Sequence, residues 1–402
     1  MFDLLMLPVG VIQSIASHSR DSAVAFRKTC RLMRDEYDST ISFMNMHADD
    51  DQDAYVPFLM RNGQFIKTIN THNFLLFPKN LLSVFVGLAT IATTCPNLVK
   101  LNVNNMGSLV SSLEPLRGLK RLEVLKANRC SFKELEPLVG ATSLTNLSIS
   151  FEYIKAAEVA VVFPKLKKLT VLEICMATRE HVDSLYGCNI KYLDIVDADS
   201  FDMNRLPCSI ERLSVSDGLK WNSCPDLSGI DRLYKLQRFV ACVTDLGPMT
   251  FMGCGLVELN LGGTFTSLGP LINISTLRVL SCQNSSIKDI EPLVKCKALE
   301  QLDISNTLVS DLGPLYTLDR LTLLNVSNTM IKSLNGLDGC TGLLKLDVQT
   351  TMITSVAPIL ALPELHTIFV NKYIQDMKML TDKVQVNPWR TCGDVRCVFD
   401  DE

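Results

Sequence analysis

An aliphatic pattern recurs about every 22 residues along most of this chain and limits the folds that it can adopt. The pattern reads L-x-x-L-x-L and recurs in thirteen rows. Their first residues are Leu98, Leu122, Leu144, Leu169, Ile190, Ile210, Leu236, Leu256, Leu277, Leu299, Leu321, Leu343 and Leu365. A unit of this length cannot bury its apolar face alone, so successive rows must stack to make a continuous core.

The alternation inside each row predicts one short strand. The first, fourth and sixth positions point into the core, and the third, fifth, seventh and eighth positions face the opposite, concave side. Between the strands, elements such as Glu114-Pro115-Leu116 and Gly313-Pro314-Leu315 predict a short helical or 3₁₀ turn, because the fixed φ of Pro suits a first helical position. The longer gap after Leu144 leaves room for a fuller segment at Ala156–Val162.

This repeat resembles the leucine-rich repeat, and the resemblance covers residues 98–371. It is similar to the short-helix subtype of phosphatase-regulating and internalin-type proteins. The expected fold class is therefore α/β: a solenoid with a curved parallel sheet on its concave face and short helices or 3₁₀ turns on its convex face. Where the family usually has Asn, Thr307, Thr329 and Thr351 predict a hydroxyl ladder between neighbouring loops.

Residues 1–45 depart from the repeat and resemble an F-box. Leu-Pro opens the segment, aliphatic residues follow in a first helix, and a Cys-Arg turn ends it. An F-box binds a Skp-type adaptor and, through it, a cullin, and the matching positions are Leu7, Pro8, Val11, Ile12, Ile15, Cys30, Met33 and Arg34. The alternative is a small helical cap on the first repeat. Residues 46–97 are expected to form an acidic linker and an irregular first repeat, and residues 372–402 a C-terminal cap and tail.

The middle rows place apolar side chains beside acidic ones on the concave face. Monomers seldom leave such a patch open, so we expect a protein partner there. Its contact residues are expected to be Val171, Glu173, Tyr192, Asp194, Val196, Asp197, Asp217, Arg238, Val240 and Val243. The acids would favour a basic segment on that partner. The alternative is that loops or the C-terminal tail cover the patch.

Composition and motifs weigh against other functions. The net charge is -4, so a basic nucleic-acid face is not expected. The longest apolar stretch, residues 81–92, is too short to span a membrane. No motif for nucleotide, metallopeptidase or hydrolase chemistry occurs, so we expect no enzyme activity, cofactor or metal site.

The cysteines indicate a reducing compartment, cytoplasmic or nuclear. Six of them recur two or three residues before a row, in one structural position that is expected to be buried: Cys95, Cys188, Cys208, Cys254, Cys296 and Cys340.

Taken together, these features favour the substrate receptor of a Skp-cullin-F-box ubiquitin ligase, with the substrate held on the concave repeat face. Two alternatives remain: a leucine-rich-repeat scaffold or phosphatase-regulating adaptor without a ubiquitin role, and a structural subunit of a larger assembly.

Overall fold

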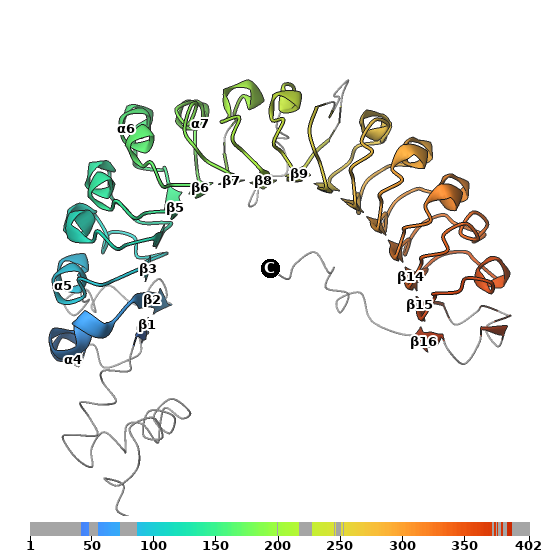
Figure 1. Cartoon of the computed structure of the whole chain (residues 1–402), viewed down its shortest axis with the longest axis horizontal. Helices are drawn as coiled ribbons and strands as arrows, with labels where there is room; N and C mark the ends of the chain where they lie inside the picture. The colour runs from blue at the N-terminus through green and yellow to red at the C-terminus, as the bar shows by residue number, and fades with distance from the viewer. Residues whose placement is uncertain are drawn as a thin grey trace, which may run out of the picture. The chain divides into compact units, whose positions relative to one another are not determined.

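A computed structural model describes residues 42–47, 55–72, 87–198, 200–216, 227–244, 246, 251, 253–371, 374, 376, 379, 380 and 384–387. The chain forms two compact units, residues 1–190 and residues 191–402. In each unit the strands lie along the inner side of a curve and the helices along its outer side (Figure 1).

The first unit is a parallel sheet in which each strand pairs with its neighbour in sequence. Its strands are β1 (Phe43–His47), β2 (Thr68–His72), β3 (Lys100–Asn102), β4 (Val124–Ala127), β5 (Asn146–Ser150) and β6 (Val171–Cys175). Its helices are α4 (Tyr55–Asn62), α5 (Leu88–Thr94), α6 (Ala156–Val162) and α7 (Arg179–Asp183). Its 3₁₀ helices are η3 (Gly63–Phe65), η6 (Glu114–Gly118), η7 (Glu136–Gly140) and η8 (Phe163–Lys165).

The second unit repeats this plan. Its parallel strands are β7 (Tyr192–Val196), β8 (Arg212–Ser216), β9 (Arg238–Cys242), β10 (Glu258–Gly262), β11 (Val279–Ser281), β12 (Gln301–Asp303), β13 (Leu323–Asn325), β14 (Lys345–Asp347), β15 (Thr367–Phe369) and β16 (Gln385–Asn387). Its 3₁₀ helices are η9 (Met203–Arg205), η10 (Ile230–Arg232), η11 (Gly269–Leu271), η12 (Glu291–Lys295), η13 (Gly313–Thr317) and η14 (Ala357–Ile359).

Every one of the thirteen rows contributes a strand at its third to fifth positions, as the pattern predicts. The register keeps the rows in phase, so that Leu302 lies beside Leu324 and Leu324 beside Leu346. All three side chains are buried, and so are Leu299 and Ile304 at the first and sixth positions of their row. Stacked aliphatic side chains therefore make up the core, which explains why the chain needs few aromatic residues.

The convex elements also follow the prediction. Pro115 and Pro314 stand in the first turn of η6 and η13, where their missing N–H leaves no helical hydrogen bond unmade. The longer row after Leu144 forms a true α-helix, α6, over the predicted Ala156–Val162. Val159 and Val162 are its buried face.

The eighth position of the rows differs from the prediction. In nine of the eleven rows whose eighth position is described, it is a turn position with a positive φ, and Phe151 and Val243 are the exceptions. The residues there with positive φ are Asn105, Arg129, Met176, Asp197, Asn284, Asn306, Asn328, Thr350 and Gly263. Asn, Asp and Gly tolerate this conformation best, so the strand alternation does not extend to this position.

The hydroxyl ladder takes another form than expected. Thr307, Thr329 and Thr351 each donate to the carbonyl oxygen three residues back in their own row, at 2.7, 2.6 and 2.7 Å. These hydrogen bonds close each turn locally instead of joining neighbouring loops. Backbone N–H groups make the links between rows, for example from Asn306 to the carbonyl of Ser327.

The parallel sheet extends beyond the thirteen rows at both ends of the sequence. β1 and β2 pair in parallel ahead of β3, and β16 pairs in parallel with β15. The acidic run at residues 49–53 and most of residues 372–402 lie outside the described residues. So does the F-box-like segment, with Leu7, Pro8, Val11, Ile12, Ile15, Cys30, Met33 and Arg34.

Candidate functional site

The candidate site is the open face of strands β7 to β10 in the second unit. We use "open face" for the side of the sheet that bears the third, fifth and seventh positions of each row. The register brings the third positions together in the order Tyr192, Arg212, Arg238 and Glu258. One aromatic ring, two cations and one acid thus form a line across four neighbouring strands.

Only some of the charges in this line form ion pairs. Arg238 forms an ion pair with Glu258 at 3.1 Å. The guanidinium of Arg212 lies 5.1 Å from the ring centroid of Tyr192, a cation–π arrangement. Among the described residues, no carboxylate forms an ion pair with Arg212, and its side chain is exposed. Arg212 is therefore the positive charge that this face offers to solvent.

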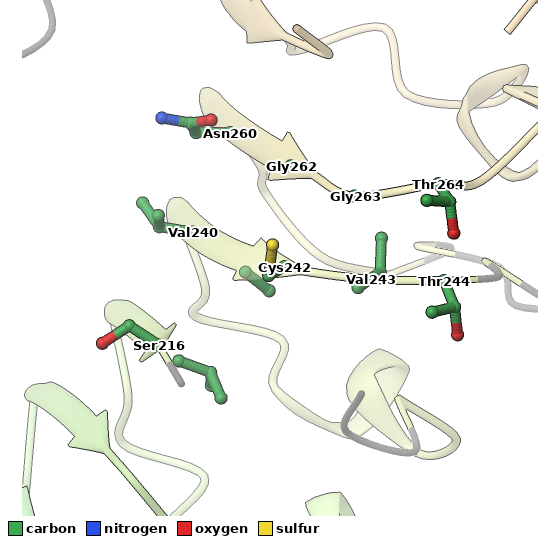
Figure 2. Close-up of a pocket in the computed structure, with 11 residues that line it drawn as sticks. Ser216, Val240, Cys242, Val243, Thr244, Asn260, Gly262, Gly263 and Thr264 are labelled. Carbon is green, nitrogen blue, oxygen red and sulfur yellow. The ribbon is translucent and has the colours of Figure 1, made fainter. Parts of the chain in front are cut away.

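A hollow of about 350 Å³ lies beside this line of side chains, over the ends of β8, β9 and β10. Figure 2 shows Ser216, Val240 and Asn260 at one end of it and Thr244 and Thr264 at the other. Its lining is mainly apolar and also includes Val215, Ala241, Cys242, Val243, Gly262 and Gly263. A concave, mostly apolar site with a few polar groups at its rim is the usual form of a binding pocket.

The absence of a side chain at Gly262 leaves this hollow open, and Gly263 allows the close turn beside it. A Cβ atom at Gly262 would lie 3.3 Å from the Sγ of Cys242, so its absence leaves the space open. Gly263 has a φ of 113°, and a Cβ there would lie 2.0 Å from the carbonyl oxygen of Val243. Sequence reasoning missed the hollow, although the pair Gly262-Gly263 at the end of a predicted strand is the signal that marks it.

The structure places the predicted apolar contact residues unequally. Tyr192 is 37% exposed, and Val196 and Val240 are half-buried on the open face. Val243 is only 1% exposed, so the prediction that it presents a concave surface is wrong. At this eighth position the backbone does not take the left-handed turn, and the side chain points into the core. Val243 contributes only to the floor of the hollow.

The predicted acidic residues are mostly engaged. Asp194 and Asp197 are half-buried in the second unit and make polar interactions of their own. Asp217 lies outside the described residues. With Arg212 the exposed charge and Glu258 paired, the expectation of a basic partner segment is not supported by this face.

Val171 and Glu173 belong to β6 in the first unit. Both are half-buried. The side-chain amide of Asn128 donates to Ser148 Oγ at 2.5 Å and to Glu173 Oε1 at 2.8 Å. This network spans β5 and holds the carboxylate of Glu173, which indicates a structural role for it.

Acids and amides in the later rows are structural as well. Asp303, Asn325 and Asp347 occupy fifth positions, and each accepts the N–H two residues ahead, at 2.9, 3.1 and 2.9 Å. Asn325 also donates to Asp303 at 3.2 Å. Asp347 is only 8% exposed, and burial raises its pKa to about 6 despite the hydrogen bond from Gln349.

The cysteine position before the rows is largely buried, as predicted. Cys95, Cys188, Cys296 and Cys340 are buried, whereas Cys208 and Cys254 are half-buried. Loss of solvation raises the pKa of Cys296 to about 11 and that of Cys340 to about 12. Such thiols stay protonated at neutral pH and behave as small apolar side chains.

Over the described ranges, no group of three or more His, Cys, Asp or Glu side chains could hold a metal ion. None of the helices in the described part of the chain is long and apolar enough to cross a bilayer.

Comparisons with known proteins agree with this fold. Residues 275–317 match the family model "Leucine Rich repeats (2 copies)". No curated protein matches the sequence. Among solved structures, TLR13 in its complex with ssRNA13 is 15% identical with a TM-score of 0.52, over 87% of this chain and 62% of that chain.

Two bacterial structures are also similar. An internalin (InlF) from Listeria monocytogenes is 20% identical with a TM-score of 0.48, over 75% of this chain and 89% of that one. A leucine-rich-repeat protein from Leptospira interrogans is 15% identical with a TM-score of 0.48, over 86% of this chain and 100% of that one. At 15% identity, the likeness to the TLR13 structure concerns the fold alone.

Proposed function

We propose that this leucine-rich-repeat chain is a non-catalytic protein-binding module and that the open face of β7 to β10 is its partner surface. The observation that supports this most is the exposed pair Tyr192–Arg212 next to Val240 and the apolar hollow. An aromatic ring, an arginine and a pocket in one patch are the features of an interface hot spot.

Substitution of the surface residues tests this proposal. Tyr192→Asp combined with Val240→Asp should abolish recovery of protein partners in affinity purification from cells. The melting temperature should change little, because both side chains are at least partly exposed. Tyr234→Asp is the matched control, since Tyr234 is an exposed tyrosine of the same unit outside the patch. Unchanged recovery by the double variant would contradict the proposal.

A more specific form of the proposal is that the protein is the substrate receptor of a Skp-cullin-F-box ubiquitin ligase in the cytoplasm or nucleus. Its support is the resemblance of residues 1–45 to an F-box and the order of that segment before the repeats. The receptor would do no chemistry. It would raise the concentration of substrate lysines near the ligase.

Deletion of residues 1–45 tests the specific form. A Skp-type adaptor and a cullin should be recovered with the full chain and lost with the deletion. If neither is recovered with the full chain, the ubiquitin role fails, while partner binding to the open face can still be measured. Recovery of a phosphatase catalytic subunit instead would favour the scaffold or phosphatase-regulating alternative, and recovery of a stable multi-subunit complex would favour the structural-subunit alternative.

A further inference from the structure

We infer that the hollow over β8 to β10 takes a large apolar side chain of an extended peptide segment, and that Arg212 binds a carboxylate of the same segment. This inference rests on the proposed function, because it names the kind of partner that the open face takes. The expected segment is acidic and carries an apolar anchor, whereas the sequence alone suggested a basic segment.

The shape of the hollow argues for a single anchor side chain. Its volume of about 350 Å³ is at the lower end of ligand pockets, enough for one aromatic or branched side chain and some of its backbone. Val240 forms an apolar wall and Val243 lies at the floor, and the missing side chain at Gly262 leaves the space open.

The rim of the hollow offers hydrogen bonds to a peptide backbone. The hydroxyl groups of Ser216, Thr244 and Thr264 and the amide of Asn260 line it (Figure 2). Such groups both donate and accept hydrogen bonds, which suits the alternating N–H and C=O groups of an extended chain. They are neutral, so the hollow itself provides no site for a charged anchor.

The charge next to the hollow argues for a carboxylate. Arg238 is already paired with Glu258, whereas Arg212 contacts the ring of Tyr192 and no carboxylate within the described part of the chain. A guanidinium stacked on an aromatic ring keeps its N–H edge available for two parallel hydrogen bonds to a carboxylate. A peptide acid there would add a matched charge without displacing an existing ion pair.

The spacing along the strands sets the sequence of the segment. Arg212 and Ser216 stand four residues apart on β8, about 13 Å at 3.3 Å per residue. Because the arginine side chain can reach part of this distance, the acid should stand two to four residues from the anchor. A helical segment would need about nine residues to span the full 13 Å, since it rises only about 1.5 Å per residue.

Selection from a phage-displayed library of random linear 12-residue peptides tests the inference on the purified full chain. We expect enriched peptides with Asp or Glu two to four residues from Phe, Trp, Leu, Ile or Met. Gly262→Val, which fills the hollow, should remove the preference for the apolar anchor. Arg212→Glu should replace the preference for an acid by one for Lys or Arg. A synthetic enriched peptide should bind each variant at least tenfold more weakly.

Controls separate binding from folding. Gly255→Val adds the same side chain in the same repeat where nothing lies within 4 Å, and it should select the same motif as the unaltered chain. If Gly262→Val lowers the melting temperature, the charge swap at the exposed Arg212 still decides the outcome. The inference is overturned if no motif is enriched, if the acid and the anchor stand more than four residues apart, or if the motif survives both substitutions.

The same experiments keep the two proposals apart. Loss of partner recovery by Tyr192→Asp and Val240→Asp without any enriched motif would leave the protein-binding proposal intact and reject the peptide segment. Enrichment of the motif with no effect of those substitutions on cellular partners would support the peptide segment and contradict the protein-binding proposal.

Discussion

The guanidinium of Arg212 stacks over the ring of Tyr192 on the neighbouring strand, 5.1 Å from the ring centroid. Both side chains stand at the third position of their rows, where the register places them opposite each other. Cross-strand pairs of this kind stabilise a sheet by up to about 1 kcal/mol. Here the pair also holds a long, exposed cation in a fixed orientation on the open face, which lowers the entropy lost when a partner binds.

The close approach of Gly263 to the Val243 carbonyl predicts a large cost for any added side chain. Gly263→Ala should destabilise the protein by about 2 kcal/mol or more, because the Cβ meets backbone and φ is positive. Thermal or chemical denaturation measures the loss. Gly255→Ala, where the space is open, should change the stability by less than about 0.5 kcal/mol. Equal effects at the two positions would mean that the turn at Gly263 is not as described.

Burial of Asp347 predicts a pH-dependent stability. Its pKa is raised from 3.8 to about 6 in the folded chain, so the folded state binds more protons than the unfolded state between these values. The contribution of Asp347 to the free energy of unfolding is therefore greatest below about pH 4, and it falls as the pH rises through about 6.

Asp347→Asn should remove this effect, because the amide oxygen can still accept the N–H of Gln349. The variant should melt at a higher temperature than the unaltered chain at pH 7.5, and the difference should shrink towards pH 4.5. Asp311→Asn is the control, since Asp311 is exposed and accepts the N–H of Gly313 in the same way. A gain at pH 4.5 that equals the gain at pH 7.5 would contradict the assignment.

The local hydrogen bond of Thr329 predicts a smaller and more specific effect. Its buried hydroxyl donates to the carbonyl of Val326 at 2.6 Å, so Thr329→Val should cost about 1 kcal/mol by leaving that acceptor without its side-chain donor. Thr329→Ser keeps the donor and should recover much of the loss in chemical denaturation. If Val is tolerated as well as Ser, the hydroxyl does not stabilise the turn.

The periodic part of the fold could be predicted from the sequence because burial dictates it. Leu302 and Leu324 recur at the spacing of the rows, and no other arrangement buries them all. The eighth position could not be predicted by alternation, since Asn306 and Asn328 are there for their tolerance of a left-handed backbone. A pattern of alternating side chains carries no information about that backbone preference.

The candidate site was only partly predictable for a related reason. Tyr192 and Val240 follow from the register alone, and the structure places both on the open face. The hollow depends on side chains that are missing at Gly262, and the free charge of Arg212 depends on which neighbour pairs with Glu258. These are properties of the contacts between strands, and a single row does not contain them.

Site-specific photocrosslinking decides whether the open face of β7 to β10 is the partner surface. A benzoylphenylalanine residue replaces Val240 in the full chain expressed in cells, and Tyr234 on the same unit is replaced in the control. Irradiation should link a partner protein to the chain through position 240, and the adduct should disappear when Tyr192→Asp is added. Adducts through position 234 alone, or adducts at 240 that Tyr192→Asp leaves unchanged, would contradict the open face of β7 to β10 as the partner surface.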